Sequence, residues 1–400
     1  MNRLRDEVRL RRVREALAGA GLDGVVCALP ENVLLLSGYW PVVGNALALA
    51  NREGRVAVVV PEDEGQLAEK GWADEIRRFR PVTLGGLGTA VESVRGPLAR
   101  AAESLGLNRG RVGYEAGPFT QPAAYAALSS YGGGVAGLIG EAAPSARAEP
   151  ADELLRVLRG VLTPRERDAL RATCRVAERA FRSGSRQLRA GLLETEAAVH
   201  FRAPLSTAGT GFEGVCRADG FAWCMSGPNA AEAGGAYARS RARPLCRGDL
   251  VLVHCNSYAD GYWVDVTRTY SLGEPGDRRP LFEAVFAARA AALAAARPGV
   301  KASAVDRAAR GVLEAAGFGP NFTHPTGHGV GFAAIDPRAR PRLHPASDDV
   351  LEEGMVFNIE PAIYIDGVCG LRHCDVVALT AAGPEVLTPF QATIEELIIP

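Results

Sequence analysis

The strongest constraint on this chain comes from two stretches that each predict a β-hairpin closed by an Asp-Gly turn. In the first, the apolar run 250–254 and a β-branched, aromatic run flank Asp260 and Gly261. This dipeptide favours tight hairpin turns because glycine tolerates positive φ. His254 and Asp265 are expected to lie symmetrically about the turn, where directly paired residues are about 5 Å apart at Cβ.

The second hairpin repeats this pattern near the C-terminus. The runs 355–364 and 368–379 flank the dipeptide Asp366-Gly367. Glu360 and Cys374 are equidistant from that turn, so we expect them to face each other as well. Each pair is close enough to hold one ion, and the chemistry of the protein is expected at these two hairpins.

Composition excludes several classes of protein. The chain has 400 residues and a net charge of −1, which indicates about two domains and argues against binding of nucleic acid or an anionic membrane. No apolar run approaches the roughly 20 residues that span a bilayer, and the N-terminus predicts a charged amphipathic helix. The eight cysteines lack CxxC spacing, which argues against a disulfide framework. We expect a cytoplasmic protein.

The N-terminal part predicts an α/β domain over residues 1–145. Its helical and strand-like segments alternate, with a turn expected at Pro30-Glu31-Asn32. The stretch 140–153 is rich in alanine, proline and charge, so the domain boundary is expected inside it and residues 146–162 are predicted to be a linker. The second domain is then expected to occupy residues 163–400.

The second domain predicts two tandem units, each made of two helices and a hairpin. A long helix is expected from Thr163 as N-cap and Pro164 as first helical residue, and a second helix near Glu194. Two further helices, over 279–297 and 302–316, precede the second hairpin. A pseudo-twofold α+β domain would bring both hairpins together at its centre.

Four motifs in order resemble the pita-bread metallopeptidase family. They are GDLVLVH with DGYWVDVTRTY, HPTGHGVG, LEEGMVFNIEPAIY, and GLRHCDVVALT. The family includes prolidase, aminopeptidase P, methionine aminopeptidase and the metal-free amidinohydrolase creatinase. The resemblance covers roughly residues 160–395, and the N-terminal segment PENVLLLSGYW resembles the creatinase-type N-terminal domain. It implies a pita-bread fold preceded by that domain.

The resemblance also implies a ligand set, and this sequence departs from it. The dinuclear peptidases of the family use two Asp, one His and two Glu as metal ligands. The matching positions are His254, Asp265, His328, Glu360 and Cys374. Because two carboxylates are replaced, a close pair of cations would lack compensating charge. We expect either one divalent ion (zinc, cobalt, manganese or iron), with His254 as a fifth ligand or a base, or no metal.

Other residues carry expected catalytic roles. Glu360 or His254 would accept a proton from water. His324 matches a frequent family position, and Arg372 is expected to orient the site. Tyr237, at a position where the family has a histidine, could donate a hydrogen bond to a substrate carbonyl. A second family histidine aligns with Ile335.

Three functions follow from these expectations. The first is an Xaa-Pro dipeptidase-like or aminopeptidase-like hydrolase that cleaves a C–N bond of a dipeptide or small amide at a mononuclear metal site. The second is a metal-independent, creatinase-like amide or amidine hydrolase. The third is a pseudo-enzyme that keeps the fold for binding. The resemblance also implies a homodimer.

Overall fold

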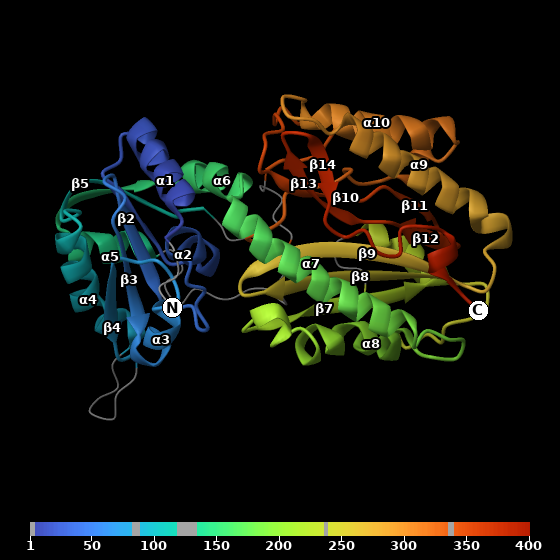
Figure 1. The fold of residues 1–400 in the computed structure, drawn as a ribbon, viewed down its shortest axis with the longest axis horizontal. Coiled ribbons are helices and arrows are strands. Elements are labelled where there is room, and N and C mark those ends of the chain that lie inside the picture. The colour runs from blue at the N-terminus through green and yellow to red at the C-terminus, as the bar shows by residue number, and fades with distance from the viewer. Residues whose placement is uncertain (1–4, 82–88, 118–133, 236–238, 335–339) are drawn as a thin grey trace. The chain divides into compact units, whose positions relative to one another are not determined.

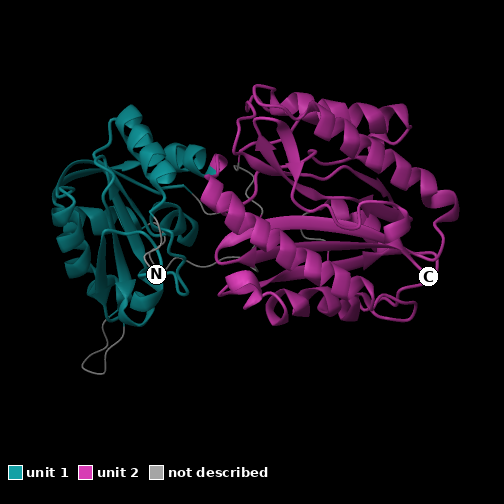
Figure 2. Ribbon diagram, in the orientation of Figure 1, with its two compact units in different colours: residues 1–159 teal, residues 160–400 magenta. Residues whose placement is uncertain are grey.

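The computed structural model describes residues 5–81, 89–117, 134–235, 239–334 and 340–400. The chain divides into two compact units, Met1–Arg159 (unit 1) and Gly160–Pro400 (unit 2) (Figure 2). Each unit has its own sheet structure and its own covering helices (Figure 1).

Unit 1 is built on a six-stranded sheet with the order β4-β3-β2-β1-β5-β6. Strand β2 is antiparallel to β1 and β3, and the other neighbours are parallel. The strands are β1 (Gly24–Cys27), β2 (Leu47–Asn51), β3 (Val56–Pro61), β4 (Glu75–Phe79), β5 (Arg109–Tyr114) and β6 (Ser145–Pro150). The helices are α1 (Glu7–Ala20), α2 (Pro30–Ser37), α3 (Gly65–Ala68), α4 (Ala90–Ser104), α5 (Val135–Ala142) and α6 (Asp152–Gly160). The predicted α/β character of this part is confirmed.

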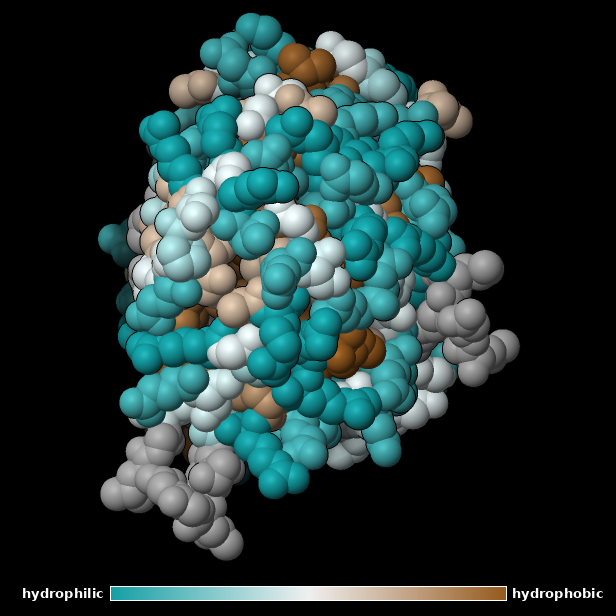
Figure 3. All heavy atoms as spheres, turned by 90° about the vertical axis from the view of Figure 1, so that its left-hand side faces the viewer, coloured by the Kyte–Doolittle hydropathy of each residue, from teal (hydrophilic) through white to brown (hydrophobic). Residues whose placement is uncertain are grey.

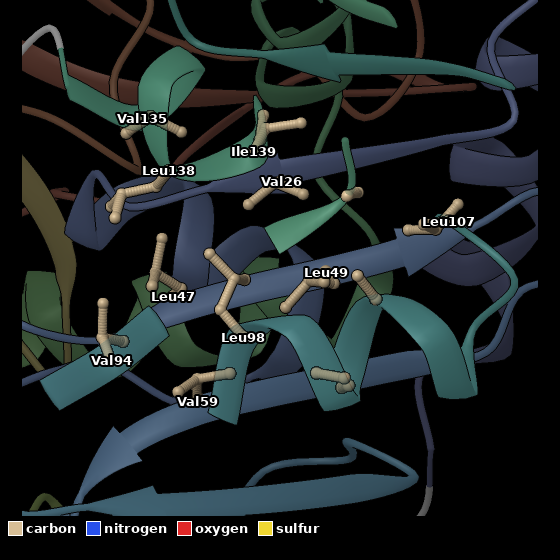
Figure 4. Close-up of a cluster of buried hydrophobic side chains, with 14 of the residues drawn as sticks. Val26, Leu47, Leu49, Val59, Val94, Leu98, Leu107, Val135, Leu138 and Ile139 are labelled. Carbon is tan, nitrogen blue, oxygen red and sulfur yellow. The ribbon is translucent and has the colours of Figure 1, made fainter. Parts of the chain in front are cut away.

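The core of unit 1 lies between the sheet and helices α4 and α5 (Figure 4). Val26, Leu49 and Val59 come from three neighbouring strands and join Leu98 and Ile139 from the two helices in one buried cluster. Burial of each such side chain contributes roughly 2 kcal/mol. Strands β1, β2 and β3 are nearly continuous apolar runs because they are buried along their length.

The face of the molecule drawn in Figure 3 is covered mainly by hydrophilic side chains, with hydrophobic residues scattered among them. Scattered apolar residues are normal on a protein surface. Across the part of the chain that the structure describes, no helix combines the length and apolar character needed to cross a bilayer.

Two sequence predictions for unit 1 were wrong. Helix α2 begins at Pro30, where the sequence predicts a turn. Proline suits a first helical position because its missing N–H would have no partner there. The carboxylate of Glu115, at the end of β5, accepts hydrogen bonds from the backbone N–H of Leu29 at 2.6 Å and from Asn32 Nδ2 at 2.6 Å. This distant cap gave no local sequence signal.

The predicted linker over 146–162 is also not a linker. Most of it forms β6 and α6, and the boundary between the units falls after Arg159. Strand β6 pairs with β5 over six residue pairs, and Leu155 and Leu158 of α6 are buried. Alanine and proline resembled linker composition, while strand pairing and an amphipathic helix decided the structure.

Unit 2 contains the predicted repeat of two helices and a hairpin. Helix α7 contacts α8, and α9 contacts α10. The helices are α7 (Pro164–Ser185), α8 (Glu194–Thr207), α9 (Arg279–Ala295) and α10 (Ala302–Ala315). The strands are β7 (Ala218–Ser226), β8 (Leu250–Ala259), β9 (Tyr262–Leu272), β10 (Val356–Ile359), β11 (Ala362–Ile365), β12 (Cys369–Arg372), β13 (Asp375–Thr380), β14 (Gly383–Val386) and β15 (Ile398–Ile399). Thr163 caps α7 in a capping box with Glu166, as its sequence predicts.

The first hairpin is confirmed, but its register differs from the prediction. Asp260 and Gly261 form the two-residue turn between β8 and β9, which pairs Ala259 with Tyr262. Counting outward, His254 faces Thr267, and Asp265 faces Asn256. His254 and Asp265 are therefore offset by two residues rather than directly opposite.

The second hairpin has the predicted register, with a break in each arm. Strands β11 and β12 pair next to the turn, and β10 and β13 pair farther out. Glu360 and Cys374 occupy matching positions in the gap between these two ladders, beside Pro361. Cys374 instead forms an isolated bridge with Thr267 of β9, which joins the second hairpin to the first.

Candidate active site

A cavity of about 530 Å³ opens in unit 2, where the two hairpins meet. Its lining includes most of the residues that the sequence singled out. The side chains come from β8, β9, the segment after α10, the gap before β11, and β12. They are His254, Asp265, His324, His328, Glu360 and Arg372.

Asp265, His328 and Glu360 converge at the base of this cavity. His328 Nε2 lies 3.7 Å from Asp265 Oδ2 and 3.8 Å from Glu360 Oε1. The ring is oriented by Nδ1–H, which donates to the carbonyl of Gly329 at 3.0 Å. The backbone N–H of His328 donates to Asn358 Oδ1 at 2.6 Å, so both the ring and its backbone are held in place.

The environment separates the pKa values of these groups. Burial raises the pKa of Glu360 to about 7, although Arg372 opposes the shift. Burial lowers the pKa of His328, but the carboxylates of Asp265 and Glu360 outweigh it and raise this pKa to about 9. Burial raises the pKa of Asp265, and the charges of His254, His328 and Arg372 reverse that effect and lower it. Asp265 is thus ionised, His328 is charged at neutral pH, and Glu360 titrates there.

His254 is held on both sides. Its Nδ1 accepts a hydrogen bond from Arg372 Nη2 at 2.5 Å, and its Nε2 lies 2.5 Å from Asn256 Oδ1. Nε2 is also 3.3 Å from Asp265 Oδ1. A guanidinium can only donate, so Nδ1 carries the lone pair and Nε2 carries the proton. Burial lowers the pKa of His254, which keeps the ring neutral.

Arg372 connects the two hairpins. Its Nε donates to Thr267 Oγ1 of β9 at 3.1 Å, and its Nη1 donates to the carbonyl of Ala233 at 3.4 Å. The same guanidinium lies 3.9 Å from Glu360 Oε2. It is buried, and arginine stays charged in proteins. Arg372 therefore supplies a fixed positive charge next to both Glu360 and His254.

Cys374 lies outside the cavity lining and is fully buried. Its thiol donates to the backbone carbonyl of Asp265 at 3.2 Å. Burial raises the pKa of this thiol well above its usual value, and the charges of Asp265 and Glu360 add to the shift. The thiol of Cys374 therefore acts as a hydrogen-bond donor to the first hairpin.

His324 lies at the side of the cavity. Its Nδ1 donates to the carbonyl of Pro325 at 2.8 Å, and its Nε2 accepts from the hydroxyl of Tyr364 at 3.0 Å. Burial lowers the pKa of His324 to about 4. The ring is neutral and fixed in one tautomer. Tyr237 and Ile335, the two positions where family histidines are replaced, lie outside the described residues.

Sequence reasoning missed three residues that shape the site: Asn256, Asn358 and Tyr364. Asn256 could have been found, because it faces Asp265 once residues are counted outward from the Asp260-Gly261 turn. Asn358 precedes Glu360 by two residues, on the same side of an extended chain. Tyr364 offered no comparable signal, since its partners His324 and Arg372 come from separate segments.

Two family models match the chain. Residues 9–161 match the creatinase/prolidase N-terminal domain, and residues 168–381 match metallopeptidase family M24. The second match covers more than half of the 400 residues. The chain belongs to metallopeptidase family M24. The predicted pita-bread family and its two-domain organisation are thereby confirmed.

Curated M24 relatives are described as peptidases. The chain is 25% identical to an Xaa-Pro dipeptidase of Pyrococcus horikoshii over 384 residues, which is 95% of this chain and 96% of the relative. It is 31% identical to the Xaa-Pro dipeptidase of Pyrococcus furiosus over 241 residues, covering 59% and 65% of the two chains. A probable dipeptidase PepE of Mycobacterium tuberculosis is 37% identical over 235 residues, covering 58% and 60%.

Solved structures share the fold across almost the whole M24 chain. A dipeptidase of Pyrococcus horikoshii is 26% identical with a TM-score of 0.75, and the match covers 98% of this chain and 100% of that one. An Xaa-Pro dipeptidase of Bacillus anthracis has a TM-score of 0.77 at 24% identity, covering 98% and 99%. The N-terminal domain of the FACT subunit SPT16 of Eremothecium gossypii has a TM-score of 0.70 at 15% identity, covering 98% of both chains. The last two show the fold alone.

Family M24 implies a divalent metal, but the side chains of this M24 chain do not fit one. Among the described residues, no group of three or more His, Cys, Asp or Glu side chains is arranged to hold a metal ion. Both ring nitrogens of His254 are engaged, and the thiol of Cys374 donates to the backbone carbonyl of Asp265. The five-residue ligand set therefore stays a prediction.

Proposed function

We propose that this M24 chain hydrolyses a C–N bond of a dipeptide or small amide by acid–base catalysis. The observation that carries the proposal is the meeting of Glu360 and His328 in one cavity, 3.8 Å apart, with pKa values of about 7 and about 9. Two titratable groups whose pKa values are pushed apart can serve as base and acid at the same pH. The descriptions of relatives as Xaa-Pro dipeptidases support a peptide-like substrate.

The reaction begins with Glu360 as the base. Its carboxylate accepts a proton from water, and the oxygen of that water bonds to the carbonyl carbon of the substrate. The charged ring of His328 stabilises the oxyanion that forms on the carbonyl oxygen. Glu360 then gives its proton to the amide nitrogen, the C–N bond breaks, and an amine and a carboxylic acid leave. Water supplies all the atoms added.

Asp265 holds the charge of His328 through the cycle. Its Oδ2 lies 3.7 Å from His328 Nε2, while its Oδ1 lies 3.3 Å from His254 Nε2. Above the pKa of His328, Asn358 Nδ2, which is 3.2 Å away, donates to the neutral ring. The oxyanion then loses its stabilising charge, so the reaction requires His328 in its charged form.

The cavity limits the substrate to a small molecule. A volume of about 530 Å³ falls within the range of sites for compact ligands. Arg342 and His344 also line it, and Asp349 fixes Arg342 by accepting from its Nε at 3.0 Å. A cationic residue at this place suits a substrate with a carboxylate, such as a dipeptide.

Two other functions remain as outcomes of the test. A single-metal dipeptidase would have to rely on Asp265, His328 and Glu360 alone, because His254 and Cys374 are bound to other partners. A binding protein without turnover would leave every substrate intact. The dipeptide and amide assays below separate these outcomes from metal-free hydrolysis.

The decisive experiment measures hydrolysis of an Xaa-Pro dipeptide panel and a small-amide panel with chelator-treated protein. We expect turnover of at least one panel member. Glu360→Gln should lower kcat by about 10²-fold or more, because the base is lost while the shape is kept. The matched control, Glu353→Gln, changes an exposed glutamate and should leave kcat unchanged. Equal rates for both variants would refute the role of Glu360.

A further inference from the structure

We infer that this centre needs no divalent ion, because the buried guanidinium of Arg372 supplies a fixed positive charge and His254 presents an N–H to the centre where a metal ligand would present a lone pair. The inference deepens the function proposed above for the same site. It concerns metal occupancy, which can be measured whether or not a substrate is known.

The contact with Arg372 fixes the tautomer of His254. Arg372 Nη2 donates to Nδ1 at 2.5 Å, so the ring proton must be on Nε2. If the Asn256 amide were turned over, its NH₂ group would face Nε2 and both ring nitrogens would have to accept. A neutral imidazole cannot do that. His254 therefore presents its N–H to Asn256 Oδ1, with Asp265 Oδ1 3.3 Å from the same nitrogen, and it has no lone pair left for a metal.

Cys374 occupies the other position at which the family pattern has a carboxylate. Cys374 is fully buried, and its thiol donates to the carbonyl of Asp265 at 3.2 Å. Asn358 Nδ2 lies 3.6 Å from the sulfur. These contacts fix the sulfur against the backbone of Asp265, and Cys374 does not line the cavity. A carboxylate here would instead add charge beside Glu360.

The fixed charges of the centre come close to balance. Asp265 and Glu360 carry at most two negative charges, and the guanidinium of Arg372, 3.9 Å from Glu360, supplies one positive charge. One negative charge remains, and a single proton on His328 or Glu360 neutralises it. A divalent ion would leave an excess positive charge in a buried site, which is unfavourable at low dielectric.

The first experiment measures metal content directly. Full-length protein is treated with chelator, dialysed, and titrated with Zn²⁺, Mn²⁺ and Co²⁺ by calorimetry, with elemental analysis of protein purified without added metal. We expect no stoichiometric ion and no change in melting temperature on adding or removing metal. One bound ion per chain, with a melting temperature that falls on chelation and recovers on metal addition, would overturn the inference.

The second experiment restores both carboxylates. The variant His254→Asp with Cys374→Glu removes the N–H donor and adds two negative charges at the centre. We expect its affinity for Mn²⁺ or Co²⁺ to rise at least about tenfold over that of the unchanged chain. The matched control combines His200→Asp and Cys246→Glu, which make the same changes away from the cavity. It should bind no better than the unchanged chain.

The outcomes separate the two proposals. If the restored variant binds no better than the control, His254 and Cys374 are not what excludes the ion, and the inference fails. If the unchanged chain binds no metal and also cleaves no substrate, the proposed hydrolysis fails while the metal-free centre stands. If it binds metal and cleaves a dipeptide, hydrolysis stands and the metal-free centre fails.

Discussion

At the scale of residues, Glu360 and His328 show how surroundings assign chemical roles. Glu360 is buried, His328 is partly buried, and the two side chains lie 3.8 Å apart. Burial favours the neutral form of each group, but His328 faces two carboxylates and Glu360 faces a guanidinium as well as Asp265. The result is a base that ionises near neutral pH beside an acid that stays protonated above it.

This pair predicts a bell-shaped dependence of kcat/KM on pH. Activity should rise as Glu360 ionises near pH 7 and fall as His328 loses its proton near pH 9. Steady-state rates from pH 5 to pH 10 check this expectation with any substrate that the panels identify. In Glu360→Gln the rising limb should disappear from the residual activity. A profile with no rise around neutral pH would contradict the assignment of the base.

At the scale of elements, three segments of unit 2 are joined by a buried ion network behind the site. Asp375 of β13 accepts from Arg268 Nη2 of β9 at 2.7 Å and from Arg289 Nε of α9 at 2.5 Å. Burial raises the pKa of Asp375, but these cations outweigh it and hold the pKa well below its usual range. The network ties the first hairpin to the second next to Cys374.

Asp375→Asn should lower the free energy of unfolding by about 3–5 kcal/mol, because it leaves buried cations without a partner. The folded pKa of Asp375 is depressed, so its stabilisation is fully present above the unfolded value of about 4 and is lost as pH falls below it. Urea unfolding at several pH values should therefore show a flatter acid limb in the variant. Asp277→Asn, at an exposed aspartate, is the control and should behave like the unchanged chain.

Elements next to a turn or a helix cap could be predicted from the sequence, whereas contacts between residues far apart in the sequence could not. The Asp-Gly turns located both hairpins, and the Thr163 cap located α7. The predicted pairing of His254 with Asp265 was wrong. With Asp260 and Gly261 as the turn, the register pairs Ala259 with Tyr262, and His254 then faces Thr267, two residues beyond Asp265. The contact between Arg372 and His254 joins positions 118 residues apart, and no local pattern encodes it.

At the scale of the whole molecule, each unit has its own core. In unit 1 the cluster around Val26, Leu98 and Ile139 is buried between the sheet and two helices. The described residues that line the cavity belong to unit 2. The sequence predicted two domains, while the boundary moved because β6 and α6 join unit 1 through strand pairing and apolar contacts.

Leu98→Ala should destabilise unit 1 selectively. Removing this buried side chain costs about 2–5 kcal/mol through lost burial and a residual cavity. Hydrogen exchange followed by mass spectrometry should show faster exchange in peptides of unit 1, with peptides of unit 2 unchanged. Leu293→Ala, at a partly exposed position of α9, is the comparison, and it should leave unit 1 unaffected. Equal acceleration in both units after Leu98→Ala would show that they unfold together.

The bridge between Thr267 and Cys374 joins the two halves of the repeat at the centre of the site. Neither half of the repeat holds a complete set of reagents, since one brings Asp265 and His254 while the other brings Glu360 and Arg372. His254 receives one of its two ring hydrogen bonds from Arg372 of the opposite half. A substitution at either position would therefore leave a buried polar group in the other half without its partner.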